Sequence, residues 1–291
     1  MMYRSKYAIA TLVMAMMLGQ PSQAANELPD LGTNAFSSLT PEKEKVIGDV
    51  MMRETLGRLP MAHDPLLDEY LNTLGQRLVA KAEDVRFPFN FYWVNSKEIN
   101  AFATLGGHIV SNTGTLAVAE TESEFASVIS HEITHITQRH IARAVEARSQ
   151  SGPLTMASIL GSILLATVNP EAGMAGLMAT QGAAQQSAIN FTRSNEQEAD
   201  RIGLQLLVNA GFDPYAMPEF FNKLNEKTRF ANTQLAFLYT HPLSQARIAD
   251  SRVRAQQYPQ RFIADGSDFL LAKARIFARY QLSPKDALSY F

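Results

Sequence analysis

The sequence predicts an α+β domain that is mostly helical and contains one small β-sheet. Over most of the chain, apolar residues recur at three- and four-residue steps, the period of helices with one buried face. Between residues 87 and 111 an aromatic, extended stretch that is typical of strands replaces this period. Of the 291 residues, 46% are apolar and only 19% are charged, which is sufficient for one hydrophobic core.

The first half of the chain should form two helices and then two strands. We expect a helix from Pro41 to Leu56, with Thr40 as its N-cap, and a second helix from Asp64 to Ala80. The strand candidates are Phe87 to Val94 and, after a pair of glycines, His108 to Ser111. A small sheet therefore precedes the next helix.

That next helix, expected from Glu122 to Ala147, contains the most informative motif, His131-Glu132-Ile133-Thr134-His135. On a helix the two histidines lie one turn apart and about 40° around the axis, so both can bind one metal ion. Glu132 lies beside them, where a carboxylate can take a proton from a metal-activated water. This HExxH pattern predicts a zinc metalloprotease with one Zn²⁺ per chain.

The residues after the motif exclude one class of zinc protease. A metzincin would have Gly at position 138 and His at position 141, whereas this chain has Gln138 and Ile141. His140 lies about 140° away from His135 around a continuous helix, so it could reach the same ion only if the helix broke. We interpret His140 as a surface histidine.

A second acidic motif follows on a helix expected from Asn195 to Gly211. Glu196 and Asp200 share one face of it, so the first carboxylate can bind the metal while the second accepts the N–H of a ligating histidine. Glu198 points elsewhere and should be solvated. The alternative is that these acids only complement the helix dipole, but the HExxH motif upstream favours the metal site.

The stretch from Leu154 to Ala179 is rich in Ala, Gly, Met, Leu and Ile, and Glu171 is its only charged residue. Asn169-Pro170 divides it into two arms that are each too short to span a bilayer. We expect a helical hairpin that is buried or covers the active site. The alternative is a surface that makes peripheral membrane contact or holds unfolded substrate.

The two ends of the chain predict localisation and domain limits. Arg4 and Lys6, an apolar run, and the small residues of Ser22-Gln23-Ala24 predict a cleavable signal peptide at 1–24, and hence the periplasm. Residues 25–255 would form the metallopeptidase domain and 256–291 a helical extension. Helices are expected from His241 to Tyr258, from Asp268 to Tyr280, and again after Ser283.

Charge and cysteine content restrict the function further. The formal net charge is −2, and about −4 without the basic residues of the leader, so nothing suggests nucleic-acid binding. The chain has no Cys, which excludes disulfides, thiolate zinc ligands and a cysteine nucleophile.

Taken together, the motifs resemble the HtpX-like and CAAX-prenyl-protease type of gluzincin zinc peptidases, and most of all a periplasmic branch of that family. The shared features are HEITH, the run Glu196 to Asp200, Asn100-Ala101-Phe102-Ala103, Gly106 to Val110, and Thr240-His241-Pro242 with Arg247. The resemblance implies that His131, His135 and Glu196 bind zinc. It also implies that Glu132 is the general base and that Asp200 supports a ligand.

The family resemblance further implies a zincin-type domain in which an edge strand, here His108 to Ser111, borders the cleft and pairs with substrate backbone. The expected substrates are unfolded or misassembled envelope and outer-membrane proteins, with outer-membrane assembly machinery as a partner. Members of this branch continue into a tetratricopeptide-repeat domain, whereas no such repeat is visible before Phe291.

Two questions stay open from the sequence. His241 could stabilise the oxyanion of the transition state, or it could fill the fourth zinc position and so gate the site, while Arg247 could stabilise the oxyanion or hold the loop. The function could also be that of a chaperone-like binding module with little proteolytic activity. Glu132 favours the enzyme, because a structural zinc site has four protein ligands and needs no base.

Overall fold

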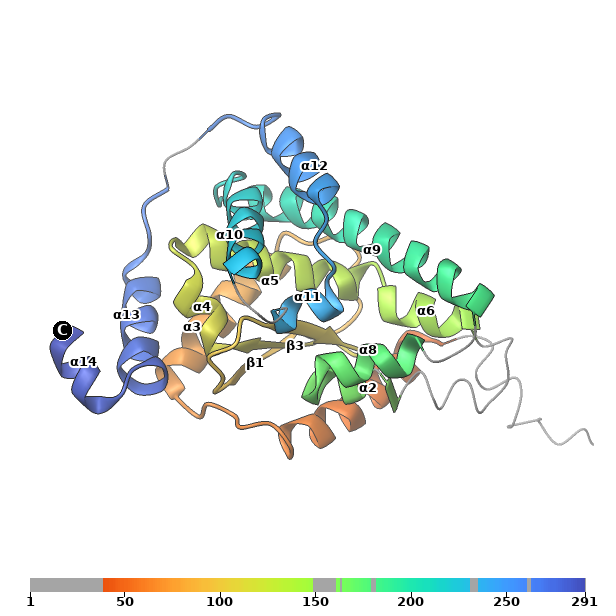
Figure 1. Ribbon diagram of the computed structural model, residues 1–291, viewed down its shortest axis with the longest axis horizontal. Helices are drawn as coiled ribbons and strands as arrows, with labels where there is room; N and C mark the ends of the chain where they lie inside the picture. The colour runs from red at the N-terminus through yellow and green to blue at the C-terminus, as the bar shows by residue number, and fades with distance from the viewer. Residues whose placement is uncertain are drawn as a thin grey trace, which may run out of the picture. The chain divides into compact units, whose positions relative to one another are not determined.

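A three-stranded sheet surrounded by helices forms the centre of the computed structural model, which describes residues 39–148, 161–162, 164–178, 182–230, 235–260 and 263–290 (Figure 1). The predicted α+β class with a mostly helical composition is confirmed. The expected signal peptide lies outside the described residues, and so do residues 154–160 and 163 of the first arm of the Leu154–Ala179 stretch. No described helix is long and apolar enough to cross a membrane.

The first two helices begin as the sequence predicts. Helix α2 covers Pro41–Leu56, and the Thr40 hydroxyl accepts a hydrogen bond from the backbone N–H of Lys43. Helix α3 covers Pro65–Val79, and the carboxylate of its N-cap, Asp64, accepts from the N–H of Leu66. Both begin with a proline, whose missing N–H costs nothing at that position.

The sheet contains β1 (Asn90–Val94), β2 (Ala101–Thr104) and β3 (His108–Asn112) in the order β1-β3-β2. Strand β3 pairs in parallel with β1 and antiparallel with β2. The prediction that His108 to Ser111 is an edge strand is therefore wrong, since that segment is the central strand and β2 is an edge. The cause is the tight turn at Gly106 and Gly107, both with positive φ, which folds β3 back onto β2.

The single helix expected from Glu122 to Ala147 is two helices, α5 (Glu122–Thr137) and α6 (His140–Arg148), so that prediction is wrong. The chain breaks at Arg139, which has a φ of 55°. This unfavourable backbone conformation is held by the Arg139 side chain, whose Nε lies 2.6 Å from Oε1 of the buried Glu44. Periodicity along the chain gives no sign of such a contact.

The remaining helices include three that are not predicted from the sequence, α4 (Thr113–Val118), α10 (Ala216–Phe230) and α11 (Ala236–Thr240). The others differ from the predictions mainly in length, and they are α8 (Pro170–Met178), α9 (Gly182–Asn209), α12 (Gln245–Ala255), α13 (Ser267–Ile276), a π-helix at Phe277–Gln281 and α14 (Pro284–Tyr290). Helix α9 begins well before the expected Asn195. Helix α12 begins after its N-cap Ser244, so His241 lies in the preceding loop rather than on this helix.

Helix α5 lies between the sheet and α9 and is buried along nearly its whole length (Figure 1). Phe125 is fully buried and stacks on Trp93 of β1 with ring centroids 5.5 Å apart. Ile133 belongs to the same core cluster, and so do Leu207 of α9 and Phe269 of α13. Because this core fixes α5 against α9, it also fixes the side chains that the two helices present to each other.

Candidate metal centre

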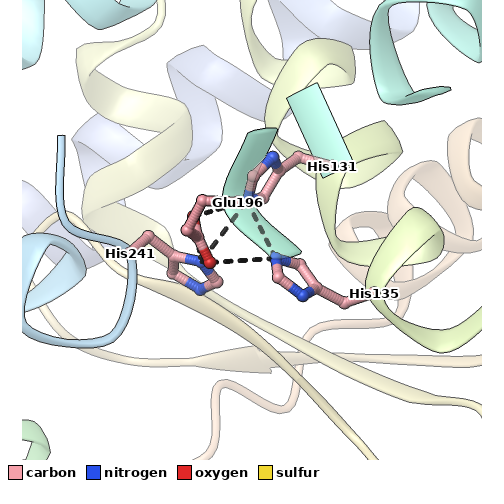
Figure 2. A group of neighbouring side chains, drawn as sticks. All are labelled: His131, His135, Glu196 and His241. Carbon is pink, nitrogen blue, oxygen red and sulfur yellow. Dashed lines mark hydrogen bonds and ion pairs between the residues drawn. The ribbon is translucent and has the colours of Figure 1, made fainter. Parts of the chain in front are cut away.

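Four side chains from three helical regions converge at one buried point (Figure 2). His131 and His135 come from α5, Glu196 comes from α9, and His241 follows α11 as its C-cap. One potential ligand atom from each lies within 4.8 Å of all the others. The close approach of α9 depends on Gly203, because a Cβ there would lie 3.3 Å from the Cα of His131.

The distances from Nε2 of His131 to the other donors are close to those expected around a tetrahedral metal ion. A zinc ion with bonds of about 2.0–2.1 Å places its ligand atoms about 3.3 Å apart. Here Nε2 of His131 lies 3.0 Å from Nε2 of His135, 3.4 Å from Oε2 of Glu196 and 3.3 Å from Nδ1 of His241. Nδ1 of His241 lies 3.2 Å from Oε1 of Glu196. Three imidazoles and one carboxylate are also a donor set that zinc prefers.

The carboxylate of Glu132 faces this cluster and is fully buried. Among the described residues neither of its oxygens makes a hydrogen bond of normal geometry, and its Oε1 lies 3.4 Å from Nε2 of His241. Burial raises the pKa of Glu132, while the imidazoles of His241 and His131 oppose this shift. A fully buried carboxylate that lacks a hydrogen bond of normal geometry is costly, so its presence calls for a functional explanation.

Asp200 lies behind His131, with its Oδ1 3.2 Å from Nδ1 of that imidazole. The Arg247 guanidinium binds both oxygens of Asp200 at 2.7 Å, and its Nη1 lies 3.0 Å from Oε2 of Glu196. The same guanidinium donates to the carbonyl of Pro242 at 2.7 Å. Burial raises the pKa of Asp200, but the Arg247 guanidinium more than offsets it, and the net shift is downward. The carboxylate therefore stays ionised.

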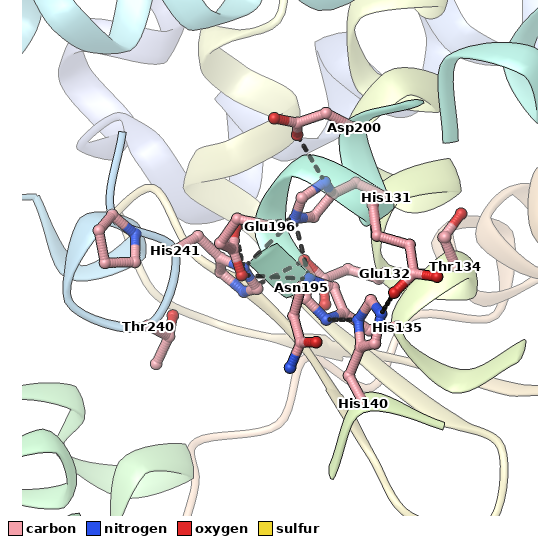
Figure 3. Close-up of polar contacts among 12 residues, drawn as sticks. His131, Glu132, Thr134, His135, His140, Asn195, Glu196, Asp200, Thr240 and His241 are labelled. Carbon is pink, nitrogen blue, oxygen red and sulfur yellow. Dashed lines mark hydrogen bonds and ion pairs between the residues drawn. The ribbon is translucent and has the colours of Figure 1, made fainter. Parts of the chain in front are cut away.

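His140 contradicts the prediction of a surface histidine, because it is only 3% exposed and lies next to His135 (Figure 3). Its Nδ1 lies 2.8 Å from Nδ1 of His135, and its Nε2 lies 3.1 Å from Oε2 of Glu198. Glu198 points away from Glu196 as predicted, yet it is not simply solvated, since it also binds Arg143 at 2.9 Å. The break after α5 causes both differences. The sequence carries the residues but no signal for the break.

Comparisons with known proteins agree with this geometry. The sequence profile of peptidase family M48 matches residues 65–255. The chain is 47% identical over 279 residues, 94% of its length, to the beta-barrel assembly-enhancing protease of Escherichia coli (strain K12). It is 49% identical over 261 residues, 90% of its length, to the putative beta-barrel assembly-enhancing protease of Vibrio cholerae. It is also 34% identical over 154 residues, 53% of its length, to the mitochondrial metalloendopeptidase OMA1 of Arabidopsis thaliana.

The lengths of these proteins differ from that of this chain. The matches cover 57% of the Escherichia coli protein, 54% of the Vibrio cholerae protein and 29% of the Arabidopsis thaliana protein. The chain thus spans little more than half the length of the beta-barrel assembly-enhancing proteases that it matches. Within that span, the similarities confirm the family resemblance that the sequence motifs predict.

Proposed function

Since this chain belongs to peptidase family M48, a family of metalloproteases, we propose that it is a zinc-dependent endopeptidase. The observation that carries the proposal is the fully buried carboxylate of Glu132, which lies 3.4 Å from His241 beside a cluster of four potential donor atoms. A purely structural zinc site has no use for such a group.

His131, His135 and Glu196 would hold the zinc ion, because they come from the two helices that the core fixes against each other. Asp200 would orient His131 through the 3.2 Å contact of its Oδ1 with Nδ1 of that imidazole, and Arg247 would hold Asp200 and the loop after His241. His241 would be a gate, because a fourth protein donor takes the position that catalysis needs open.

When bound, zinc polarises the scissile carbonyl and lowers the pKa of the attacking water. Glu132 takes the proton of that water and passes it to the leaving amine, a role for which its raised pKa and its buried position suit it. The edge strand β2, which packs against α5, would pair with the substrate backbone. Recognition of backbone rather than side chains would permit many substrate sequences.

The proposed substrate class rests on the similarity to the beta-barrel assembly-enhancing proteases. On that basis we propose that this chain acts in the periplasm on unfolded or misassembled envelope and outer-membrane proteins. Outer-membrane assembly machinery is the corresponding partner. The second arm of the Leu154–Ala179 stretch is α8, which packs against α11 directly before His241. This contact supports the interpretation that the stretch covers the active site.

One observation favours a second function. With His241 among the donors, the metal would have four protein ligands, the arrangement of a structural site. A chain fixed in that state would bind clients as a chaperone-like module and cleave little.

Zinc-loaded wild-type protein and the Glu132→Gln variant, incubated with unfolded casein, test the proposal. The variant should keep one zinc per chain, because the substitution removes no metal ligand. It should lose cleavage by a factor of about 10²–10⁴, because it lacks the general base. Equal cleavage by both proteins would contradict the role of Glu132. If zinc-loaded wild-type protein and the ungated His241→Ala variant both fail to cleave casein, the binding module is the better description.

A further inference from the structure

His140 is outside the donor cluster, yet it is as deeply buried as the donors themselves. Both nitrogens of its imidazole lie within hydrogen-bonding distance of a side chain: Nδ1 at 2.8 Å from Nδ1 of His135, and Nε2 at 3.1 Å from Oε2 of Glu198. Arg143 binds the same oxygen of Glu198 at 2.9 Å. These four side chains form a continuous chain from His135 to the surface.

The backbone is shaped to make this contact. On a continuous helix His140 would lie about 140° around the axis from His135 and could not reach its ring. The left-handed turn at Arg139 redirects the chain, and it is held by the buried Glu44 and by the carbonyl of Leu39, both of which accept from the Arg139 guanidinium. A conformation that is unfavourable for arginine is therefore stabilised by dedicated partners.

The positions of the protons along this series of hydrogen bonds follow from the Glu198 carboxylate at its outer end. An ionised carboxylate only accepts hydrogen bonds, so Nε2 of His140 carries a proton and donates a hydrogen bond to Glu198. In a neutral imidazole Nδ1 is then an acceptor, so it accepts from Nδ1–H of His135. His135 is thereby left with a lone pair on Nε2, the atom that faces the donor cluster.

We propose that His140 is a positioning residue that, with Glu198, holds His135 in the tautomer and orientation that metal binding requires. The inference rests on the proposed metal site. It gives His135 the support that Asp200 gives His131, with one difference: an imidazole is inserted between the ligand and the carboxylate. Both carboxylates belong to α9, so one helix would orient both histidines of the HExxH motif.

The first test measures zinc affinity by competition with a chelator. His140→Phe keeps a buried ring but removes both nitrogens, and it should weaken zinc binding about 10- to 100-fold. His140→Gln offers an oxygen acceptor and should restore part of the affinity. His108→Phe is the matched control, since His108 is also buried but is bonded to Asp49 and is not part of the donor cluster. Wild-type affinity in a folded His140→Phe variant would overturn the proposal.

The second test needs no metal and no activity. Nitrogen-15 NMR of histidine rings in the metal-free protein should show His135 protonated at Nδ1, and Glu198→Gln should yield a mixture of tautomers, because an amide can donate as well as accept. Glu198 is partly exposed, so this variant should fold even if His140→Phe does not. Predominant Nε2 protonation of His135 in the wild-type protein would overturn the proposal.

The two proposals can fail separately. If wild-type protein binds zinc and the His140 and Glu198 variants behave as expected, but casein is not cleaved, then only the peptidase function is wrong. If the wild-type protein binds no zinc, the proposed function fails, and the tautomer of His135 in the metal-free protein still decides the role of His140.

Discussion

The two histidines of the HExxH motif are supported in different ways. Behind His131 is an inner arm, Asp200 with Arg247, whose side chains are 2% and 4% exposed. Behind His135 is an outer arm, His140 with Glu198 and Arg143, of which the last two are 28% and 39% exposed. The inner arm reaches its histidine with a carboxylate directly, whereas the outer arm uses an imidazole as a relay.

The difference shows how burial changes what an ion pair does. Charges in the inner arm are removed from water, so each depends on its partner and the loss of one leaves the other uncompensated. Charges in the outer arm are partly hydrated, so their interaction is screened and contributes little to folding. We therefore expect the inner arm to affect both stability and metal binding, and the outer arm to affect mainly metal binding.

The largest effect is expected where the arms meet, at Glu196. Its two oxygens lie 3.4 Å from Nε2 of His131 and 3.4 Å from Nε2 of His135, so Glu196→Ala removes a proposed ligand that contacts the histidines of both arms. Metal analysis of the purified variant should show that stoichiometric zinc is lost, as it should for His135→Ala. The exposed neighbour Gln197 is the control, and Gln197→Ala should keep its zinc. Full zinc content in Glu196→Ala would refute the ligand assignment.

The second effect separates the arms by stability. Arg247→Met leaves the buried carboxylates of Asp200 and Glu196 without their cation and should lower the free energy of unfolding by about 3–5 kcal/mol. Arg143→Met removes the cation of the outer arm and should lower it by at most about 1 kcal/mol. Urea denaturation of the metal-free proteins compares the two. Equal losses would show that burial does not distinguish the arms.

How well the sequence predicts each arm follows from the same difference. The Asp200 carboxylate of the inner arm follows from spacings within two helices, four residues in HExxH and four from Glu196 to Asp200, and such spacings can be recognised from sequence. Its partner Arg247 lies on a third helix, α12, and no spacing identifies that pairing. The outer arm depends on the helix break at Arg139, which is held by Glu44, about a hundred residues earlier in the chain. No local pattern records that contact.

The sheet illustrates the same limit. The strand segments around Phe91 and Ile109 could be predicted from their composition, but the order of the strands depends on which partner each finds in space. His108 to Ser111 therefore appears as a plausible edge strand in the sequence and is the central strand in the fold. The predicted domain limits and the roles of the individual site residues stay predictions.

A third ion pair, outside the metal centre, tests whether burial of the carboxylate alone makes the loss of an ion pair costly to stability. Asp64 is fully buried, while its partners Arg275 and Arg279 are 34% and 51% exposed. Burial raises the pKa of Asp64, but the hydrogen bond and charge of Arg275 more than offset it, so the net shift is downward. Asp64→Asn keeps an N-cap for α3 and should cost about 1–2 kcal/mol at pH 7, between the values for the two arms.

The pH dependence of this pair has a definite sign. A carboxyl group whose pKa is lower in the folded state stabilises the fold above its unfolded pKa, and this contribution is lost as the pH falls through the folded value. The difference in unfolding free energy between wild-type and Asp64→Asn proteins should therefore be constant near neutral pH and shrink below about pH 4. A difference that persists unchanged into that acidic range would contradict the assignment.

The last prediction concerns His241, the donor that has no arm. Its Nδ1 faces Glu196 at 3.2 Å, but its outer nitrogen faces the Glu132 carboxylate at 3.4 Å, so the group behind this ligand is the proposed base itself. A donor held in this way can leave more easily than His131 or His135, and its departure frees the fourth metal position and Glu132 together. If the open state is about a tenth of the population, His241→Ala should raise peptide hydrolysis about tenfold with zinc retained. The exposed His63 provides the control, and His63→Ala should change nothing. A loss on the order of a hundredfold would instead assign His241 to transition-state stabilisation and rule out gating as its main role.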